Sequence, residues 1–116
     1  MKRIIGNSIG IDSGEKVLFS DFEDGGEMWT GSGPRERRNR IIFSTRYKET
    51  PTVQASLALW DVDNATVMRA DIRCENISED GFDLVFRTWG DTRIARVRVA
   101  WMAIGALSHK DDWDLY

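Results

Sequence analysis

Two stretches decide the fold: PTVQASLALWDV at residues 51–62 and VMRADIRCEN at residues 67–76. Apolar and polar residues alternate along both, which is typical of a β-strand with one face buried and one face in water. The apolar sides consist of Val53, Ala55, Leu57 and Leu59 in the first stretch and Met68, Ala70, Ile72 and Cys74 in the second. We therefore predict a strand in each stretch, with turn residues between them at Asp61, Asp63 and Asn64.

The same alternation continues toward the C-terminus. Residues 77–81 indicate a hairpin connection, because Gly81 accepts the backbone conformations that tight turns require. The next strand is expected to pair with the one before it and to bury Phe82, Leu84 and Phe86. After a turn at residues 90–92, the longest strand covers residues 94–104 and buries Val97, Val99, Trp101 and Ala103.

The first half is less regular. Residues 16–19 and 40–44 are predicted as short strands, separated by a loop of about twenty residues rich in Gly, Asp and Glu. Within that loop, Met28 and Trp29 are expected to dock on the body of the protein. No stretch has the length and periodicity of a substantial helix.

These elements predict an all-β fold, a six-stranded antiparallel β-sandwich. The 116 residues suit a single domain, residues 1–116, with a core at about residues 8–104 and a short extension at 105–116. Trp113 and Tyr116 in the extension are expected to lie on the body or on a neighbouring protomer. Cys74, the single cysteine, is interpreted as a small core residue.

Composition excludes several classes of partner. The 16 Lys and Arg residues against 19 Asp and Glu give a net charge of −3, which does not attract nucleic acid. No window approaches the ~20 apolar residues of a membrane span, so we expect no membrane insertion. Residues 1–14 lack the apolar stretch of a secretory signal. We expect a soluble protein and leave its localisation open, because secretion and association with a particle are both compatible with the sequence.

Residues that usually carry catalysis are scarce. His109 is the single histidine, so neither a typical zinc site nor the usual base for a nucleophile is expected. A carboxylate pair for glycoside cleavage would have to come from the glycine-rich loop, which holds Asp21, Glu23, Asp24 and Glu27. The cluster at residues 61–64 is interpreted as turn capping rather than a calcium site. We therefore expect no catalysis, no metal and no cofactor.

Arginines recur in two runs. The first contains Arg35, Arg37, Arg38 and Arg40, without the interleaved aromatic residues that stack on bases. The second pairs Arg96 with Arg98 on the face opposite Val97 and Val99. Both runs are interpreted as surfaces that face solvent or a neighbouring protomer.

Several motifs, taken in order, resemble the H-type lectin domain, the family of snail agglutinin and of the C-terminal part of slime-mould discoidins. They are Gly10-Ile11-Asp12-Ser13-Gly14, Phe43-Ser44 with Tyr47 and Pro51, Trp60-Asp61-Val62-Asp63 with Arg69, Ile77-Ser78-Glu79-Asp80-Gly81-Phe82, Thr88-Trp89-Gly90-Asp91-Thr92-Arg93 and Ala100-Trp101-Met102-Ala103-Ile104. Together they cover about residues 8–104.

The resemblance implies a trimer without catalytic activity. It also implies glycan sites between adjacent protomers, with a preference for galactose or N-acetylgalactosamine. At matching positions, Arg69 would hydrogen-bond the sugar and Trp89 would pack on its apolar side. Both roles are chemically reasonable, because sugar sites combine an aromatic platform with multi-donor side chains. The alternatives are a surface arginine and a core tryptophan.

Three positions depart from the family's pattern. Ser32 stands where the family has an aspartate, Gly90 where a histidine is common, and Ala95 where a tyrosine contacts the sugar. A wider and less aromatic cleft is therefore expected, in which Asp91, Asp24 or Glu27 is a candidate replacement for the missing acceptor.

The sequence thus favours a lectin-like carbohydrate-binding protein whose sugar site contains Ser32, Arg69, Trp89, Gly90 and Asp91. One alternative is a structural or attachment component of a phage-like or secreted assembly that keeps the scaffold without a working sugar site. A small glycoside-active enzyme is a third hypothesis.

Overall fold

The computed structural model describes residues 1–108, so His109, Trp113 and Tyr116 lie outside the described residues. Strands dominate, and the helices are two single turns. The elements are β1 (Ile9–Phe19), α1 (Asp21–Asp24), α2 (Glu27–Thr30), β2 (Arg35–Ile42), β3 (Thr52–Val62), β4 (Asp71–Glu75), β5 (Gly81–Thr88) and β6 (Ile94–Ala106). No helix within residues 1–108 has the length and hydropathy needed to cross a membrane.

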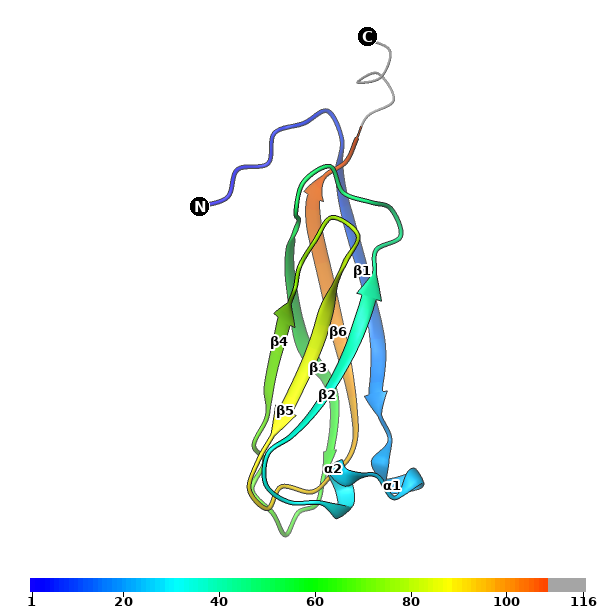
Figure 1. The fold of residues 1–116 in the computed structure, drawn as a ribbon, viewed down its shortest axis with the longest axis vertical. Coiled ribbons are helices and arrows are strands. Elements are labelled where there is room, and N and C mark those ends of the chain that lie inside the picture. Colours follow the sequence, from blue (N-terminus) through cyan, green and yellow to red (C-terminus); the bar gives the residue numbers. More distant parts are fainter. Residues whose placement is uncertain (109–116) are drawn as a thin grey trace.

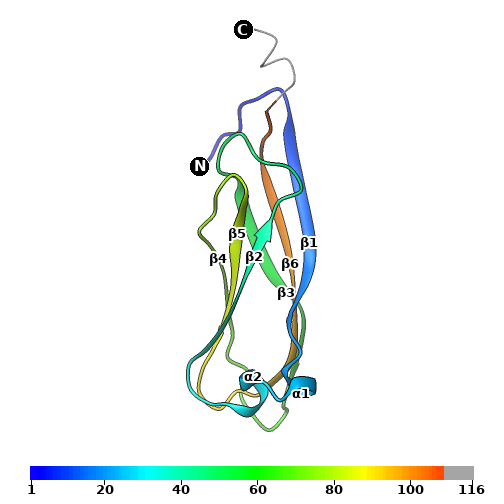
Figure 2. The ribbon, with the colours of Figure 1, turned by 45° about the vertical axis from the view of Figure 1, so that its right-hand side comes forward.

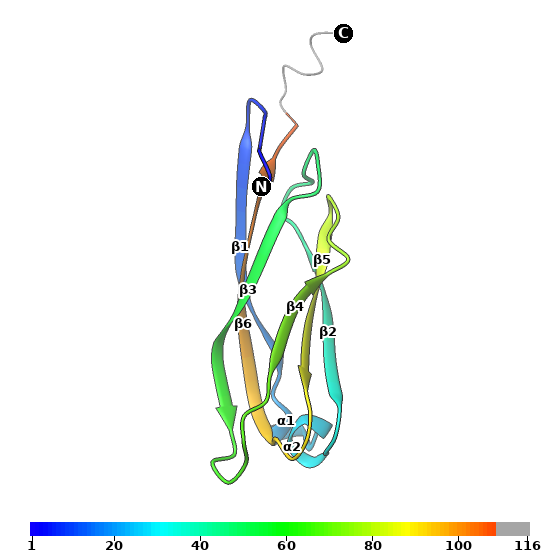
Figure 3. The same ribbon diagram turned by 90° about the vertical axis from the view of Figure 1, so that its left-hand side faces the viewer.

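The strands form two antiparallel sheets of three strands each, in the orders β1-β6-β3 and β2-β5-β4. The sheets lie face to face as two layers, with α1 and α2 at one end and the N-terminus at the other (Figures 1 and 3). The predicted six-stranded antiparallel sandwich is confirmed. The turn at residues 90–92 carries the chain from β5 in one sheet to β6 in the other, whereas β4 and β5 form the expected hairpin.

The core lies between the layers and follows the predicted alternation. The side chains of Phe82, Leu84, Phe86, Val97, Val99 and Ala103 are fully buried. Burial of each large apolar side chain contributes about 1.5 to 3 kcal/mol, so the central strands of both sheets carry much of the stability. Met28 from α2 is also fully buried, which confirms that the long loop docks on the body. Burial raises the pKa of the Cys74 thiol, which packs against this core.

Leu59, an apolar residue of the first predicted strand, does not belong to the core cluster. A register shift between Leu57 and Leu59 interrupts the pairing of β3 with β6 and places Leu59 opposite Arg98. Val53, Ala55 and Leu57 pack against the core, but Leu59 is not part of that cluster. The prediction that Leu59 shares their side was wrong, because a bulge changes which face the following residues occupy.

The two N-terminal strands differ from their predicted bounds. β1 begins at Ile9 rather than at residue 16, and β2 spans Arg35–Ile42 rather than residues 40–44. Exposed apolar residues such as Ile9 and Ile11 weaken the alternation of β1, and charged residues fill most of β2. Pairing with the core strands β6 and β5 fixes their extent instead.

The first arginine run is not a solvated surface throughout, which corrects its interpretation. Arg35 is only 6% exposed, because β2 turns it toward the other layer. Arg37 also points inward, lying over the Phe19 ring at 5.6 Å and pairing with Asp21 at 2.7 Å. The short helices close this end of the sandwich and supply acceptors, so these guanidinium groups remain hydrogen-bonded although they leave water.

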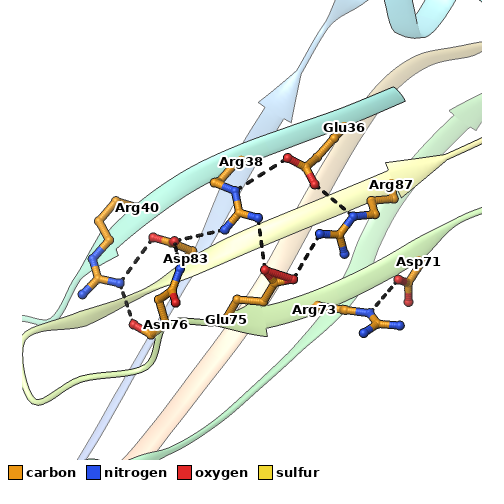
Figure 4. A network of polar contacts seen from close by, with 9 residues as sticks. All are labelled: Glu36, Arg38, Arg40, Asp71, Arg73, Glu75, Asn76, Asp83 and Arg87. Carbon is orange, nitrogen blue, oxygen red and sulfur yellow. Dashed lines mark hydrogen bonds and ion pairs between the residues drawn. The ribbon is translucent and has the colours of Figure 1, made fainter. Parts of the chain in front are cut away.

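The outer face of β2, β5 and β4 carries a network of opposite charges (Figure 4). Arg38 contacts Glu75 at 3.0 Å and Asp83 at 3.1 Å, and Arg87 contacts Glu75 at 3.2 Å. The hydrogen bond from Arg38 lowers the pKa of Glu75, with a further contribution from Arg87. The amide of Asn76, followed by the arginines, lowers the pKa of Asp83.

This network predicts acid-sensitive stability. A carboxylate whose pKa is lower in the folded state stabilises the protein above its unfolded pKa of about 4, and that stabilisation is lost as the pH falls through the folded pKa. Urea denaturation should therefore show stability falling below about pH 4. Arg38→Gln should reduce this pH dependence, whereas Arg46→Gln, which breaks a separate pair with Asp80, should reduce it less. Equal slopes for wild type and Arg38→Gln would contradict the assignment.

Candidate functional site

Three connections meet at the end of the sandwich that carries α1 and α2: residues 20–34, 63–70 and 89–93 (Figures 1 and 2). Hydrogen bonds join them. The backbone N–H of Gly33 donates to the carbonyl of Gly90 at 2.9 Å, and the Thr92 hydroxyl donates to the carbonyl of Val67 at 2.6 Å. The backbone N–H of Asp63 donates to the carbonyl of Arg93 at 2.9 Å. All the site residues predicted from sequence lie in these connections.

Arg35 holds this end together. Its guanidinium donates to the carbonyls of Gly33, Glu27, Met28 and Gly90, at distances of 2.9 to 3.3 Å. None of the ion pairs among the described residues involves Arg35, so carbonyl oxygens alone accept its hydrogen bonds. Sequence reasoning missed this role, because the four acceptors are backbone atoms from three separate segments.

Arg69 lies beside the turn that follows Trp89. Its Nη1 atom contacts Asp91 Oδ1 at 2.6 Å, and it donates to the Thr92 hydroxyl at 3.4 Å. Gly90 has a φ of +69°, and a Cβ atom there would lie 3.1 Å from Arg69 Nη1. Glycine at position 90 therefore allows the positive φ of the turn and leaves room for the Arg69 guanidinium. A wider cleft was expected because Gly90 has no side chain. The guanidinium of Arg69 lies against Gly90 and occupies that space.

Trp89 is 45% exposed and lies in a groove on the outer side of the β2-β5-β4 sheet. The groove has a volume of about 590 Å³. It is lined by Pro34, Arg35, Glu36, Ala70, Asp71, Arg73, Arg87, Thr88 and Trp89. An indole beside guanidinium and carboxylate groups offers an apolar platform together with hydrogen-bond donors and acceptors.

Arg69 is not among the described residues that line this groove. Within one protomer, the structure therefore places Arg69 and Trp89 next to the same turn but not in one hollow. Both remain accessible, since the Arg69 side chain is 31% exposed. Trp89 is therefore not a core tryptophan, whereas the exposure of Arg69 is compatible with both of its interpretations.

The remaining candidates differ in their surroundings. Ser32 is exposed and precedes Gly33, whose backbone binds Gly90. Of the candidate acceptors, Asp91 pairs with Arg69, and Glu27 pairs with Arg37 at 3.0 Å. Asp24 lies in α1. Asp91 is thus the carboxylate that the structure brings to Arg69.

Asp63 caps the turn that follows β3, as predicted, whereas Asp61 lies within β3 and not in the turn. Asp63 Oδ1 accepts the backbone N–H of Ala65 at 2.9 Å, and Oδ2 accepts from Arg93 at 3.1 Å. The guanidinium of Arg93 lies over the Trp29 ring at 4.3 Å. No cluster of three or more potential metal ligands occurs within residues 1–108.

A small antiparallel β-sandwich that gathers exposed rings, guanidinium groups and carboxylates in the loops of one end has the architecture of a ligand-binding module. The chain belongs to the H-type lectin domain family, whose model matches residues 38–104. Arg69, Trp89, Gly90 and Asp91 lie inside the matched region, whereas Ser32 precedes it.

Two curated proteins are similar to this chain in sequence. A protein of Fuscovulum blasticum named ATP synthase subunits region ORF 7 is 51% identical over 111 residues, covering 96% of each chain. Its name states no ligand. A discoidin-1 chain of Dictyostelium discoideum is 32% identical over 75 residues, which are 64% of this chain and 30% of the discoidin chain.

Solved structures of discoidin II from Dictyostelium discoideum share the fold. Two of them superpose with TM-scores of 0.73 and 0.75 at 23% and 22% identity. The matches cover 85% and 91% of this chain but only 38% and 39% of the discoidin II chains. This chain therefore corresponds to less than half of each discoidin that it matches.

Proposed function

We propose that the protein binds glycans and performs no chemistry on them. The observation that carries this proposal is the exposed indole of Trp89 at the groove, in a chain of the H-type lectin family. The C–H groups of a sugar ring pack on an aromatic face, while its hydroxyls require directed polar partners. The groove supplies both kinds of group.

The polar part of the proposed site consists of Arg69 and Asp91. A guanidinium donates to sugar hydroxyls in a fixed geometry, and a carboxylate accepts from them. Their contact at 2.6 Å holds both groups in place before a ligand arrives. Ser32 and Gly90 complete the proposed site, with the hydroxyl of Ser32 as a neutral acceptor. Galactose or N-acetylgalactosamine is the proposed sugar type.

The proposed assembly is a homotrimer with sugar sites between protomers. The outer face of the β1-β6-β3 sheet supports it, because Ile11, Val17 and Met102 are 66%, 52% and 42% exposed there. Large exposed apolar patches are typical of protein interfaces. Association would also allow Trp89 of one protomer and Arg69 of another to contact the same sugar. Several weak sites in one trimer bind a multivalent glycan more tightly than a single site does.

The alternative is a structural or attachment protein without a working sugar site. Two observations favour it: Asp91 already occupies the guanidinium of Arg69, and Ala95 replaces the family's aromatic contact. The two hypotheses predict opposite results with free glycans.

A glycan array separates them. We expect the wild-type protein to bind glycans with terminal galactose or N-acetylgalactosamine, and light scattering to give three times the chain mass. If the protein binds no glycan on the array, the result would favour the structural alternative. A monomeric mass at micromolar concentration would contradict the shared site.

A further inference from the structure

The sandwich has four edge strands, which are β1 and β3 in one sheet and β2 and β4 in the other. Natural proteins protect such edges with short strands, charged residues or bulges, because an unpaired edge can pair with another chain. Three of the four edges have a device of this kind. β4 has only 5 residues, charged residues fill most of β2, and the pairing of β3 shifts twice along its length.

The fourth edge, β1, is long, regular and partly apolar. It spans 11 residues along one side of the sandwich (Figures 1 and 3). Its pairing with β6 is regular from Ile9 to Val17 and shifts only after that. Ile9, Ile11 and Val17 are 51%, 66% and 52% exposed. An edge of this length and exposure can accept an additional strand.

The backbone of β1 directs donors and acceptors to its free side. The N–H of Leu107 donates to the carbonyl of Ser8 at 2.8 Å, so this pair is a hydrogen-bonded one that extends the register of β1 with β6. Hydrogen-bonded pairs alternate with pairs that share no hydrogen bond. The even-numbered residues of β1 therefore bond to β6. The N–H and C=O groups of the odd-numbered residues from 9 to 17 face away from it.

The sequence of β1 is complementary to itself in the antiparallel direction. When two copies of the strand are centred on Gly14, Lys16 of one copy lies opposite Asp12 of the other, and Val17 lies opposite Ile11. Opposite charges and apolar side chains that face each other across two strands stabilise the pair. Each contact occurs twice, because two copies related by a two-fold axis use the same surface.

The neighbouring registers lose this match. A centre at Ser13 places Ile11 opposite Glu15, an apolar residue against a carboxylate. A centre at Glu15 or at Asp12 places two carboxylates directly opposite each other, which destabilises a sheet. The register centred on Gly14 also places odd-numbered residues opposite each other, as the hydrogen bonds of the free edge require.

We propose that β1 pairs with β1 of a second copy of the chain, antiparallel and centred on Gly14. Two sheets of three strands then become one sheet of six. The two-fold axis is perpendicular to the sheet, so the outer faces of both copies form one continuous surface. This contact is therefore distinct from the proposed three-fold association, and it does not depend on glycan binding. Both contacts together would give an assembly of six chains.

The charged groups at this edge are available for the pairing. Lys16 is exposed, and its side chain takes part in no hydrogen bond or ion pair among residues 1–108. Asp12 Oδ1 accepts from the N–H of Ser13 at 3.0 Å and from the hydroxyl of Ser44 at 3.1 Å. In the paired edge, the N–H of Ser13 donates to the carbonyl of Glu15 in the second copy instead. This exchange leaves Asp12 Oδ1 able to accept from Lys16 of the second copy.

Disulfide trapping tests the register. Ser13→Cys and Glu15→Cys are prepared as separate full-length variants in a Cys74→Ala background, which removes the native thiol, and are mixed before oxidation. The proposed pairing places positions 13 and 15 of the two copies in a hydrogen-bonded pair, with a Cα separation of about 5.5 Å that a disulfide can span. The mixture should therefore form cross-linked heterodimers, which are identified by their mass.

Each cysteine variant alone is the matched control. Ser13→Cys can cross-link to itself only in a register centred on residue 13, and Glu15→Cys only in one centred on residue 15. Each should give about tenfold less cross-linked product than the mixture, because these registers lack the opposite charges and the apolar pair.

Lys16→Glu tests the energetics of the same contact. It replaces attraction to Asp12 by repulsion at two symmetric positions, so association through β1 should weaken about tenfold or more in sedimentation equilibrium. Arg3→Glu is the matched control, because Arg3 is also exposed but precedes β1. It should leave the association unchanged. Both variants should fold normally, since both positions are at the surface.

Three results would overturn the inference: no cross-linked product from the mixture, equal yields from the mixture and the separate variants, or equal association of the wild type and Lys16→Glu. The number of chains distinguishes this contact from the proposed trimer. Six chains that become three in Lys16→Glu would support both contacts, and two that become one would support the β1 pairing alone. Three chains in both proteins would leave the trimer intact and remove the β1 pairing.

Discussion

Replacing Arg35 by methionine is expected to lower the free energy of unfolding by about 3 to 5 kcal/mol. Methionine retains the apolar stem, but it leaves four carbonyl oxygens without the guanidinium donor that joins α2, residue 33 and the turn at residue 90. The carbonyls of Glu27 and Gly90 keep backbone donors, whereas those of Gly33 and Met28 lose the guanidinium that donates to them. A buried acceptor without a donor carries the full cost of desolvation. Urea denaturation followed by tryptophan fluorescence measures the change.

Arg35→Lys is the matched control for charge. Lysine keeps the positive charge but lacks the planar fork that reaches several acceptors at once, so about half of the loss should remain. A loss under about 1 kcal/mol for Arg35→Met would show that water replaces the guanidinium, and that Arg35 does not organise this end of the sandwich.

Trp89→Ala is expected to weaken glycan binding about thirtyfold or more, measured by calorimetry with a glycan selected on the array. The indole is the aromatic platform of the proposed site, and a central aromatic residue commonly contributes about 2 kcal/mol to binding. Stability should change by no more than about 1 kcal/mol, because Trp89 is 45% exposed.

Trp60→Ala is the matched control for the loss of an exposed indole, since Trp60 is 58% exposed and is not part of the Trp89 groove. It should bind as the wild type does. Equal affinities for the wild type, Trp60→Ala and Trp89→Ala would remove Trp89 from the site.

The second half of the fold could be predicted from sequence because large apolar residues recur there at every second position. Phe82, Leu84 and Phe86 follow this spacing in β5, and the structure buries all three, although Val85 on the opposite face is fully buried as well. Local periodicity is sufficient when a strand has a single apolar face. It fails at Leu59, because a bulge depends on pairing with β6 and leaves no local mark.

In β2, the sequence pattern did not predict which charged residues are buried. Arg35 and Arg37 look like a surface run, yet they point inward where the helical turns supply acceptors. Those acceptors come from residues 21–33, and only the tertiary fold brings them to β2. Sequence alone gives no reason to bury a guanidinium.

The candidate site could be predicted in part. Arg69 and Trp89 lie in loops at one end and stay accessible, but their relation to the turn at Gly90 required coordinates.

A sugar held between the indole of Trp89 and the guanidinium of Arg69 is the centre of the proposed function. A crystal structure of the chain with a glycan that binds on the array tests it most directly. We predict a sugar ring packed on Trp89 and hydroxyls at about 3 Å from Arg69, with the two side chains from neighbouring protomers. A sugar that contacts neither residue, or an assembly that holds Trp89 and Arg69 too far apart to share one ring, would contradict it.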